Sequence, residues 1–367
     1  MLVGSALSAI VIAILLAGDL QILVDWALPR PEVAEAGLDR PSLTLSPAAL
    51  PSPTLTASPT NPPPIPLDGT PSGPPIPFYF DSDLAGESFG GSEMLAFVSD
   101  RDGNPEIYSL EFLTGRITRL TYSDMADFHP RWSPNGNRIA FTSYRDGGPD
   151  IHTITSTGAL RQSLTAPAWF DEFPSWSVNG DWILFDSNRP DGETQNDVGA
   201  FRLFLIRTNG SDIQLVLPDA MDGAVGSFSP DGERIVFQSR AGEGEYQIYT
   251  LELETQQVVR LTHTLARNFR PSWSPDGRQI VFVSERDGQS ELYIMDADGT
   301  DQRRLTVGTL EHVRGPVWSP DGEWILFNAE LGGNTDLYVI NLNGTHLFRL
   351  TNHPSDDYHP DWQPQIQ

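Results

Sequence analysis

Apolar and polar positions alternate in short runs along most of the chain, and the runs form repeating units of about 45 residues. In the unit that begins at Pro271, a short extended segment ends in a Ser-Pro-Asp-Gly turn. Residues 278–284 then form a run rich in β-branched and aromatic side chains, followed by shorter strand-like segments at 291–295 and 303–306. Pro, Asp and Gly in the connections favour tight turns. Four strands joined by three tight turns predict one antiparallel blade of a β-propeller.

Two markers recur six times each and give the number of blades. The first is the aromatic residue before the Ser-Pro-Asp-Gly turn, with spacings of 44, 52, 45, 45 and 44 residues; it occurs at Trp132, Trp176, Phe228, Trp273, Trp318 and Trp362. The second is a phenylalanine in the following strand, at Phe97, Phe141, Phe185, Phe237, Phe282 and Phe327. A fixed period with strand-like content is typical of a toroidal array.

The two markers are offset at the ends of the repeat region. Phe97 has no aromatic anchor and turn before it, and Trp362 has no strand after it. We therefore expect residues 359–362 to supply the innermost strand of the first blade, which would leave no free sheet edge at the seam. The predicted fold is all-β, a six-bladed β-propeller of four-stranded antiparallel blades, closed by the C-terminal strand joining the first blade.

The repeated pattern resembles that of a known family. Pro-x-Trp-Ser-Pro-Asp-Gly, Ile-x-Phe-x-Ser, Arg-Asp-Gly, Ile/Leu-Tyr and Leu-Thr together resemble the repeat of TolB-type, WD40-like propellers over about Glu93 to Pro364. Related blades also form the lid domain of prolyl-oligopeptidase-like proteases. The resemblance to TolB-type propellers implies a non-enzymatic protein that grips a protein or peptide partner at the channel face.

The N-terminal residues have a different composition. Residues 2–18 are an uncharged apolar run, about the shortest length that spans a bilayer. Residues 41–78 contain 13 prolines and a single charge, too little apolar surface to bury a core. We expect a membrane anchor or a cleaved signal segment at 1–28, a disordered Pro/Ser/Thr-rich stalk at 29–78 and the propeller at 79–367. The propeller would then lie outside the cytoplasm, in the periplasm or at the cell surface.

Charge and composition narrow the partners and the chemistry. The net charge is −26, which opposes binding to nucleic acid or to anionic lipid and favours a self-repelling monomer. The chain has neither lysine nor cysteine, which excludes Schiff-base and thiol chemistry. It also has no His-Glu-x-x-His or phosphate-loop motif. We predict no enzymatic activity and no cofactor.

The segments just before each Pro-x-Trp differ between repeats, and they should meet at one mouth of the central channel. Acids are found in four of them, arginines in two, and histidines in three. Such a charged pocket could hold a zwitterion or a peptide terminus. The alternatives are a metal held by His129, His359 and a carboxylate for hydrolysis, a sensor module of a larger signalling protein, and a rim that only keeps the ring soluble. The predicted ligand-binding residues are Asp127, His129, Asp171, Glu172, Asp222, Arg267, Arg270, His312, Arg314, Asp357, Tyr358 and His359, with no catalytic or metal-binding residue assigned.

Overall fold

The computed structural model describes residues 78–79, 92, 94–190, 201–217, 221–241, 244–308 and 310–365. All of them belong to one unit of the chain. They form strands, turns and connecting segments, and within these ranges there is no helix that could cross a membrane. The predicted anchor, and the predicted stalk up to residue 77, lie outside the described residues.

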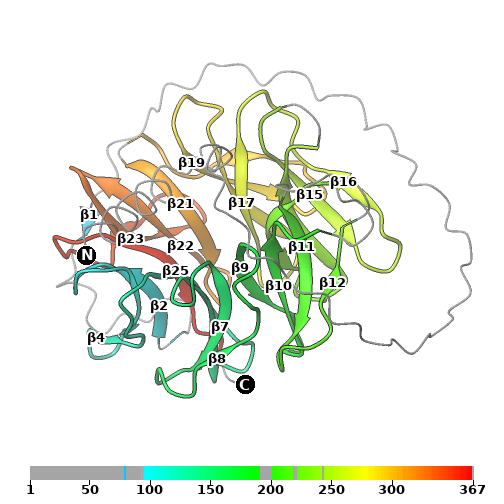
Figure 1. The fold of residues 1–367 in the computed structure, drawn as a ribbon. Helices are drawn as coiled ribbons and strands as arrows, with labels where there is room; N and C mark the ends of the chain where they lie inside the picture. The colour runs from blue at the N-terminus through cyan, green and yellow to red at the C-terminus, as the bar shows by residue number, and fades with distance from the viewer. Residues whose placement is uncertain are drawn as a thin grey trace, which may run out of the picture. The chain divides into compact units, whose positions relative to one another are not determined.

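The strands form six antiparallel sheets, each of which is one blade of a propeller, as predicted (Figure 1). In blades one to six, the innermost strands are β25 (Asp357–Trp362), β5 (Asp127–Trp132), β9 (Asp171–Trp176), β13 (Ala224–Phe228), β17 (Asn268–Trp273) and β21 (Glu311–Trp318). The second strands are β2 (Met94–Ser99), β6 (Arg138–Ser143), β10 (Trp182–Ser187), β14 (Arg234–Ser239), β18 (Gln279–Ser284) and β22 (Trp324–Leu331).

The outer half of each blade consists of two further strands in chain order. The third strands are β3 (Glu106–Glu111), β7 (Asp150–Thr155), β11 (Arg202–Arg207), β15 (Gln247–Glu252), β19 (Glu291–Asp296) and β23 (Asn334–Asn341). The fourth strands are β4 (Arg116–Arg119), β8 (Gln162–Ser163), β12 (Gln214–Leu215), β16 (Val258–Arg260), β20 (Arg303–Arg304) and β24 (Leu347–Arg349).

The ring is closed by a strand from the far end of the chain. β25 pairs antiparallel with β2, with Trp362 opposite Leu95 and Asp357 opposite Ser99. Blade one therefore has the order β25-β2-β3-β4, and Figure 1 shows β25 in red beside β2 in cyan. This pairing confirms the predicted closure. One strand was not predicted: β1 (Phe78–Tyr79) adds in parallel to β24 and makes blade six five-stranded.

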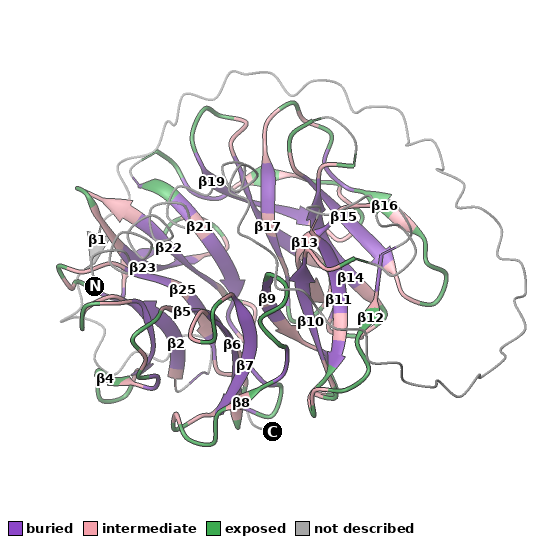
Figure 2. Ribbon diagram, in the orientation of Figure 1, coloured by how far each residue is buried: buried purple, intermediate pink, exposed green. Residues whose placement is uncertain are grey.

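The second and third strands of each blade form the core, and the loops are exposed (Figure 2). The second-strand phenylalanine is fully buried in all six blades, which contributes about 1.5–3 kcal/mol at each position. In four blades this ring packs against a third-strand tyrosine, as Phe282 does against Tyr293 at 5.8 Å between centroids. The Ile/Leu-Tyr of the repeat is therefore core packing.

The Ser-Pro-Asp-Gly turns join the innermost strand of a blade to its second strand, and successive turns pack against one another around the ring. In blade five, Ser274 Oγ donates to Asp276 Oδ1 at 2.6 Å and accepts from the Gln279 amide at 2.9 Å. Gly277 has φ +69°, a left-handed conformation that glycine adopts without strain. A Cβ on Gly277 would lie 3.6 Å from Pro230 of the preceding turn. The proline of one turn thus packs on the glycine of the next, which explains why both residues recur.

The Leu-Thr of the repeat closes a buried polar cluster at the edge of the blade. In blade five, Thr306 Oγ1 donates to Glu291 and accepts from the Leu292 amide at 2.9 Å. Arg304 pairs with the same carboxylate at 2.6 Å. Blades one and six repeat this arrangement with Glu106 and Asp336 in place of Glu291. These carboxylates hold the blade together, because a buried acid needs partners of this kind.

Closure by β25 makes the aromatic anchor Trp362 a stability determinant. We expect Trp362→Ala to lower the free energy of unfolding by about 3–5 kcal/mol, because the deleted ring leaves a cavity at the seam. Trp169→Ala, at a loop tryptophan that is 36% exposed, is the matched control and should cost far less. Urea unfolding of both variants measures this. A similar loss in both would contradict a stabilising role for the seam.

Candidate functional site

Every innermost strand has a special backbone conformation three residues before its aromatic anchor. The residue there has φ between +49° and +61°, and a β-bulge interrupts the pairing with the second strand at this point. Non-glycine residues rarely adopt this left-handed conformation, and bulges redirect side chains. The six bulge residues are His129, Phe173, Val225, Arg270, Gly315 and His359.

Four of the bulge side chains pack against one another across the channel. The His359 and His129 rings lie 4.2 Å apart between centroids, and the His129 and Phe173 rings 3.8 Å apart. The Arg270 guanidinium lies over the Phe173 ring, 5.2 Å from its centroid. We call His359, His129, Phe173 and Arg270 the channel plug. Three of its four members are among the residues predicted from the sequence.

Side chains of the preceding blade hold the bulges in place. The Arg270 amide donates to Gln238 Oε1 at 2.8 Å, and the His359 amide donates to Asn328 Oδ1 at 3.3 Å. The Val225 amide donates to both carboxylate oxygens of Asp186, at 3.0 and 2.9 Å. Sequence analysis missed these three polar residues. Their signal was a polar side chain directly after the buried phenylalanine of an otherwise apolar strand.

The two plug histidines are neutral. Burial lowers the pKa of His129 well below its ordinary value, and the charges of Arg270 and Arg131 lower it further. Burial also lowers the pKa of His359, with added contributions from His129, Arg270, Arg131 and Arg314. Both ring nitrogens of His129 and the Nδ1 of His359 are buried without a hydrogen-bond partner.

Arg270 lies among charges of both signs. Burial lowers its pKa to about 9, and Arg314 and Arg131 lower it as well, while Asp186 and Glu172 act in the opposite direction. Burial raises the pKa of both carboxyl groups. Glu172 accepts a hydrogen bond from Tyr144 Oη at 2.6 Å. The centre of the channel thus combines arginines with acids that burial shifts toward the uncharged form.

Three of the predicted acids pair within their own blades. Asp127, Asp171 and Asp357 are fully buried and pair with Arg145, Arg189 (2.6 Å) and Arg101 (2.8 Å) from the turn after the second strand. Burial raises the pKa of Asp127 to about 7, which outweighs the opposite effect of Arg145. In blade five Asn268 takes the place of the acid and accepts from Arg286 at 2.9 Å. The structure therefore places these carboxylates in a repeated structural pair.

The remaining predicted residues surround the plug on one face of the ring, which we call the loop face because the loops into the innermost strands lie there. Asp222 accepts from Ser239 Oγ at 2.8 Å, and His312 contacts Glu330 at 2.8 Å. Arg267 faces Glu245 and Glu285 at 3.8 and 3.9 Å. Arg314 lies 5.8 Å from the Phe269 ring centroid, and Tyr358 is buried against Phe128. The twelve residues do not all converge on one pocket.

A cavity of about 310 Å³ lies on the opposite side of the plug, toward the Ser-Pro-Asp-Gly turns. His129 and Phe173 line it, together with Arg131, Asp361, the aromatic anchors and the turn prolines. Among the predicted residues, all of which are described, only His129 is in this lining. Arg131 and Asp361 were missed, although their signal is a charge at the middle position of Pro-x-Trp in adjacent blades.

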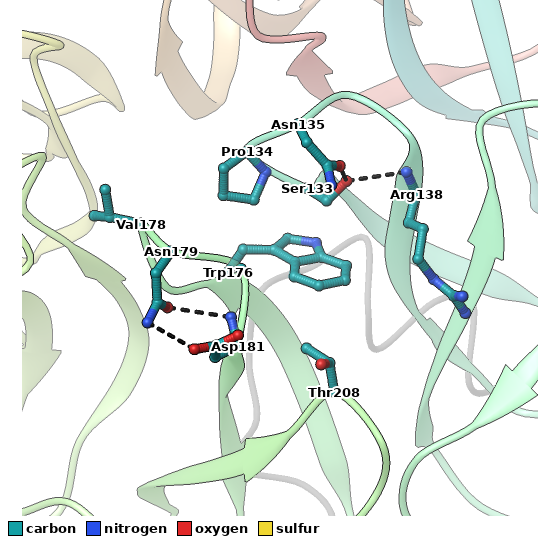
Figure 3. Close-up of a pocket in the computed structure, with 10 residues that line it drawn as sticks. Ser133, Pro134, Asn135, Arg138, Trp176, Val178, Asn179, Asp181 and Thr208 are labelled. Carbon is teal, nitrogen blue, oxygen red and sulfur yellow. Dashed lines mark hydrogen bonds between the residues drawn. The ribbon is translucent and has the colours of Figure 1, made fainter.

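A second hollow of about 510 Å³ lies between the turns of blades two and three (Figure 3). The Trp176 indole lies between Pro134 and Thr208, and Val178 stands where the other turns have proline. Trp176 Nε1 donates to the Arg131 carbonyl at 3.0 Å. The turn side chains Ser133, Asn135 and Asn179 also make local hydrogen bonds. The hollow is therefore lined by groups that already serve the turns.

The metal alternative needs a third ligand beside the two histidines. No group of three His, Cys, Asp or Glu side chains within the described ranges is arranged to hold a metal ion. His129 and His359 instead pack ring against ring. The described residues thus offer this hypothesis no ligand set.

Large apolar side chains are exposed on the loops of the loop face. They occur in four of the six loops that lead into innermost strands, and two of them, Leu265 and Tyr122, are 99% and 72% exposed. We call this set the apolar crown; it comprises Tyr122, Met125, Trp169, Phe170, Leu265 and Val307. Exposed apolar side chains are ordinary singly, but a recurrent set around one opening indicates a contact surface.

These features define a six-bladed β-propeller with a channel plug and with the apolar crown on its loop face. The sequence matches the TolB beta propeller domain over residues 88–215 and 203–315, which together span more than half of the chain. The chain belongs to the TolB beta propeller domain family. No curated protein matches the sequence significantly.

Solved structures with the same fold include TolB from Acinetobacter baumannii, at TM-score 0.65 and 22% identity, covering 77% of this chain and 69% of that one. A protein assigned as TolB from Agrobacterium tumefaciens matches at TM-score 0.58 and 18% identity, covering 75% and 99%. Oligogalacturonate lyase from Vibrio parahaemolyticus matches at TM-score 0.52 and 14% identity, covering 74% and 78%. At these identities the likeness shows the fold alone.

The neutral plug histidines predict an acid sensitivity. Below the ordinary histidine pKa the unfolded chain takes up protons that buried His129 does not, so stability falls as pH falls, by at most about 1.4 kcal/mol per pH unit for each group. The acids with raised pKa act in the opposite direction, but they are common to parent and variant. His129→Gln should therefore lose less stability than the parent between pH 7 and 5. Urea unfolding at both values measures the difference.

The control for this comparison is His346→Gln. His346 is exposed in the hairpin between β23 and β24, at the outer edge of blade six. We expect it to follow the parent protein. An identical pH dependence of His129→Gln and the parent would mean that His129 takes up its proton in the folded protein as readily as in the unfolded chain, which would contradict the prediction.

Proposed function

We propose that the chain is a non-enzymatic, extracytoplasmic binding platform that holds a protein or peptide partner on the loop face of the propeller. The observation that carries this proposal is the apolar crown. Its side chains surround an opening whose inner wall carries polar groups such as Arg267 and His312. Protein interfaces combine such apolar and aromatic contacts with polar surroundings.

The crown also accounts for the size of the partner. The loops are arranged around the opening, so a ligand that touches several of them must be larger than a small molecule. A protein surface or a folded peptide meets this requirement, and burial of exposed apolar side chains would stabilise the complex. A rigid blade framework presents the loops with little conformational cost on binding.

Membership of the TolB beta propeller domain family supports a protein-binding role. Oligogalacturonate lyase and puromycin hydrolase share the fold at low identity, so the fold alone does not decide between binding and catalysis. We propose a non-enzymatic role because the acids Asp127, Asp171 and Asp357 each form an ion pair with an arginine of their own blade.

The proposal includes the cellular compartment and the oligomeric state of the protein. The apolar run at residues 2–18 and the proline-rich segment after it support a tether that holds the propeller outside the cytoplasm. The net charge of −26 supports a monomer that avoids nucleic acid. The partner is therefore expected among proteins or peptides of the same compartment.

Site-specific photo-crosslinking tests the loop face. A benzophenone side chain at position 265, in the full chain in its native host, should give a discrete adduct with a second protein. The matched control is position 113, where Leu113 is 80% exposed in the turn after a third strand, on the opposite face. Leu265→Asp should reduce recovery of the partner with crosslinkers placed elsewhere in the crown. The same adduct from both positions, or none from 265, would contradict the proposal.

A further inference from the structure

Arg270 is a channel arginine whose side chain has no polar partner. Its guanidinium makes no hydrogen bond or ion pair with any described residue. It instead lies over the Phe173 ring in a cation–π contact. Its backbone amide is fixed on Gln238. Arg270 is only partly buried, so solvent reaches it. Arginines inside proteins are normally paired with an acid or another acceptor, so an unpaired guanidinium is a candidate binding group for an acceptor on a ligand.

The nearby acids do not fill this role. Glu172 accepts from Tyr144 Oη, and Asp186 accepts from the Val225 amide through both oxygens. Burial raises the pKa of both groups, which favours their uncharged forms. Arg314 and Arg131 act on Arg270 as like charges. The centre of the channel is therefore a place where an anion would relieve repulsion between arginines.

The cavity beside the plug supplies a second polar group without a partner. His129 is 4% exposed and lines the cavity, and neither of its ring nitrogens has a hydrogen-bond partner. A neutral imidazole carries one N–H donor and one acceptor nitrogen. A ligand atom in the cavity that accepts a hydrogen bond would satisfy the donor. His129 thus adds directional recognition to the positive charge.

Arg131 extends the same polar end of the cavity. Its Nη1 donates to Asp361 Oδ1 and to the Pro360 carbonyl, each at 3.4 Å, while Asp361 Oδ2 accepts from the Trp132 amide at 2.7 Å. Since a guanidinium has five N–H donors, Arg131 keeps donors for a further acceptor. Burial raises the pKa of Asp361 to about 6, which weakens its repulsion of an incoming anion as pH falls toward that value.

We propose that this cavity binds a carboxylate at the end lined by Arg131 and His129, with Arg131 as the charged contact and His129 as a hydrogen-bond donor. Arg270 lies over the Phe173 ring of the cavity wall and adds positive charge close to the site. A volume of about 310 Å³ admits a small molecule or the last residues of a chain and no folded domain. A planar carboxylate matches the two-pronged geometry of a guanidinium. Proline and aromatic walls suit an apolar part of the ligand next to the carboxylate. The site lies on the opposite side of the plug from the apolar crown and does not depend on the partner proposed above.

Calorimetry on the purified full chain tests the site with three probes. Succinate represents a free small carboxylate, the tetrapeptide Ala-Gly-Ala-Ala represents a chain terminus, and its C-terminal amide lacks the carboxylate. Constant ionic strength removes the general effect of salt. We expect saturable binding of succinate, of the free-acid peptide, or of both, and none of the amide. Binding of succinate alone assigns a free small carboxylate, and binding of the peptide alone assigns a chain terminus.

Variants locate the binding. Arg131→Gln should weaken it by about tenfold or more, because a charged contact to the carboxylate is lost. Arg131→Lys should have an intermediate effect, since it keeps the charge without the planar geometry. Arg278→Gln is the matched control, because the Arg278 side chain is 85% exposed in a turn outside the cavity. If Arg131→Gln does not fold, Arg270→Gln, which removes the nearby positive charge, takes its place.

The proposal is overturned by any of three results: no binding of either carboxylate probe, equal binding of the amide, or unchanged affinity in folded Arg270→Gln and Arg131→Gln. None of these results would affect the crosslinking test of the loop face, which uses other residues and another ligand.

Discussion

Six innermost strands must meet around one narrow axis, and their side chains cannot all fit there at full length. The structure meets this constraint with a β-bulge in each strand, where one residue takes a left-handed conformation. In three blades a polar side chain of the preceding blade caps the bulge amide. The bulges direct four side chains into a plug and leave a cavity on one side of it. Both the candidate carboxylate site and the separation of the two faces follow from this arrangement.

The large number of acidic residues has a structural explanation in part. Glu106, Glu291 and Asp336 hold the edge threonine and arginine of their blades, and Asp127, Asp171 and Asp357 pair with turn arginines. Removing one partner of such a buried pair leaves an uncompensated charge, which is strongly destabilising. Acids of this kind recur because every blade is built in the same way. The groups that differ between blades, such as Arg270 and His129, are the ones left for function.

The fold could be predicted from the sequence because six copies of one pattern agreed on strand order, turn type and the offset at the ends. The site could be predicted only in part. The place of His129, Arg270 and His359 before Pro-x-Trp predicted that they reach the channel. It could not distinguish them from Asp127 and Asp357, which lie two residues before His129 and His359 and pair within their own blades. The alternation of side chains in a regular strand would not place these residues correctly, because the bulge shifts the register. Arg131 and Asp361 were missed because Pro-x-Trp was interpreted as a framework segment.

The seam between β25 and β2 joins segments at opposite ends of the repeat region, and Ser92 Oγ donates to the Gln363 carbonyl across a separation of 271 residues. A chain made from its N-terminus therefore cannot assemble blade one until its last strand has been synthesised. Until then β2 presents an unpaired edge, and such edges favour wrong pairing. Contacts this distant in sequence also slow folding. The order of synthesis thus makes the first blade to be translated the last to be completed, and β25 determines when the ring can form.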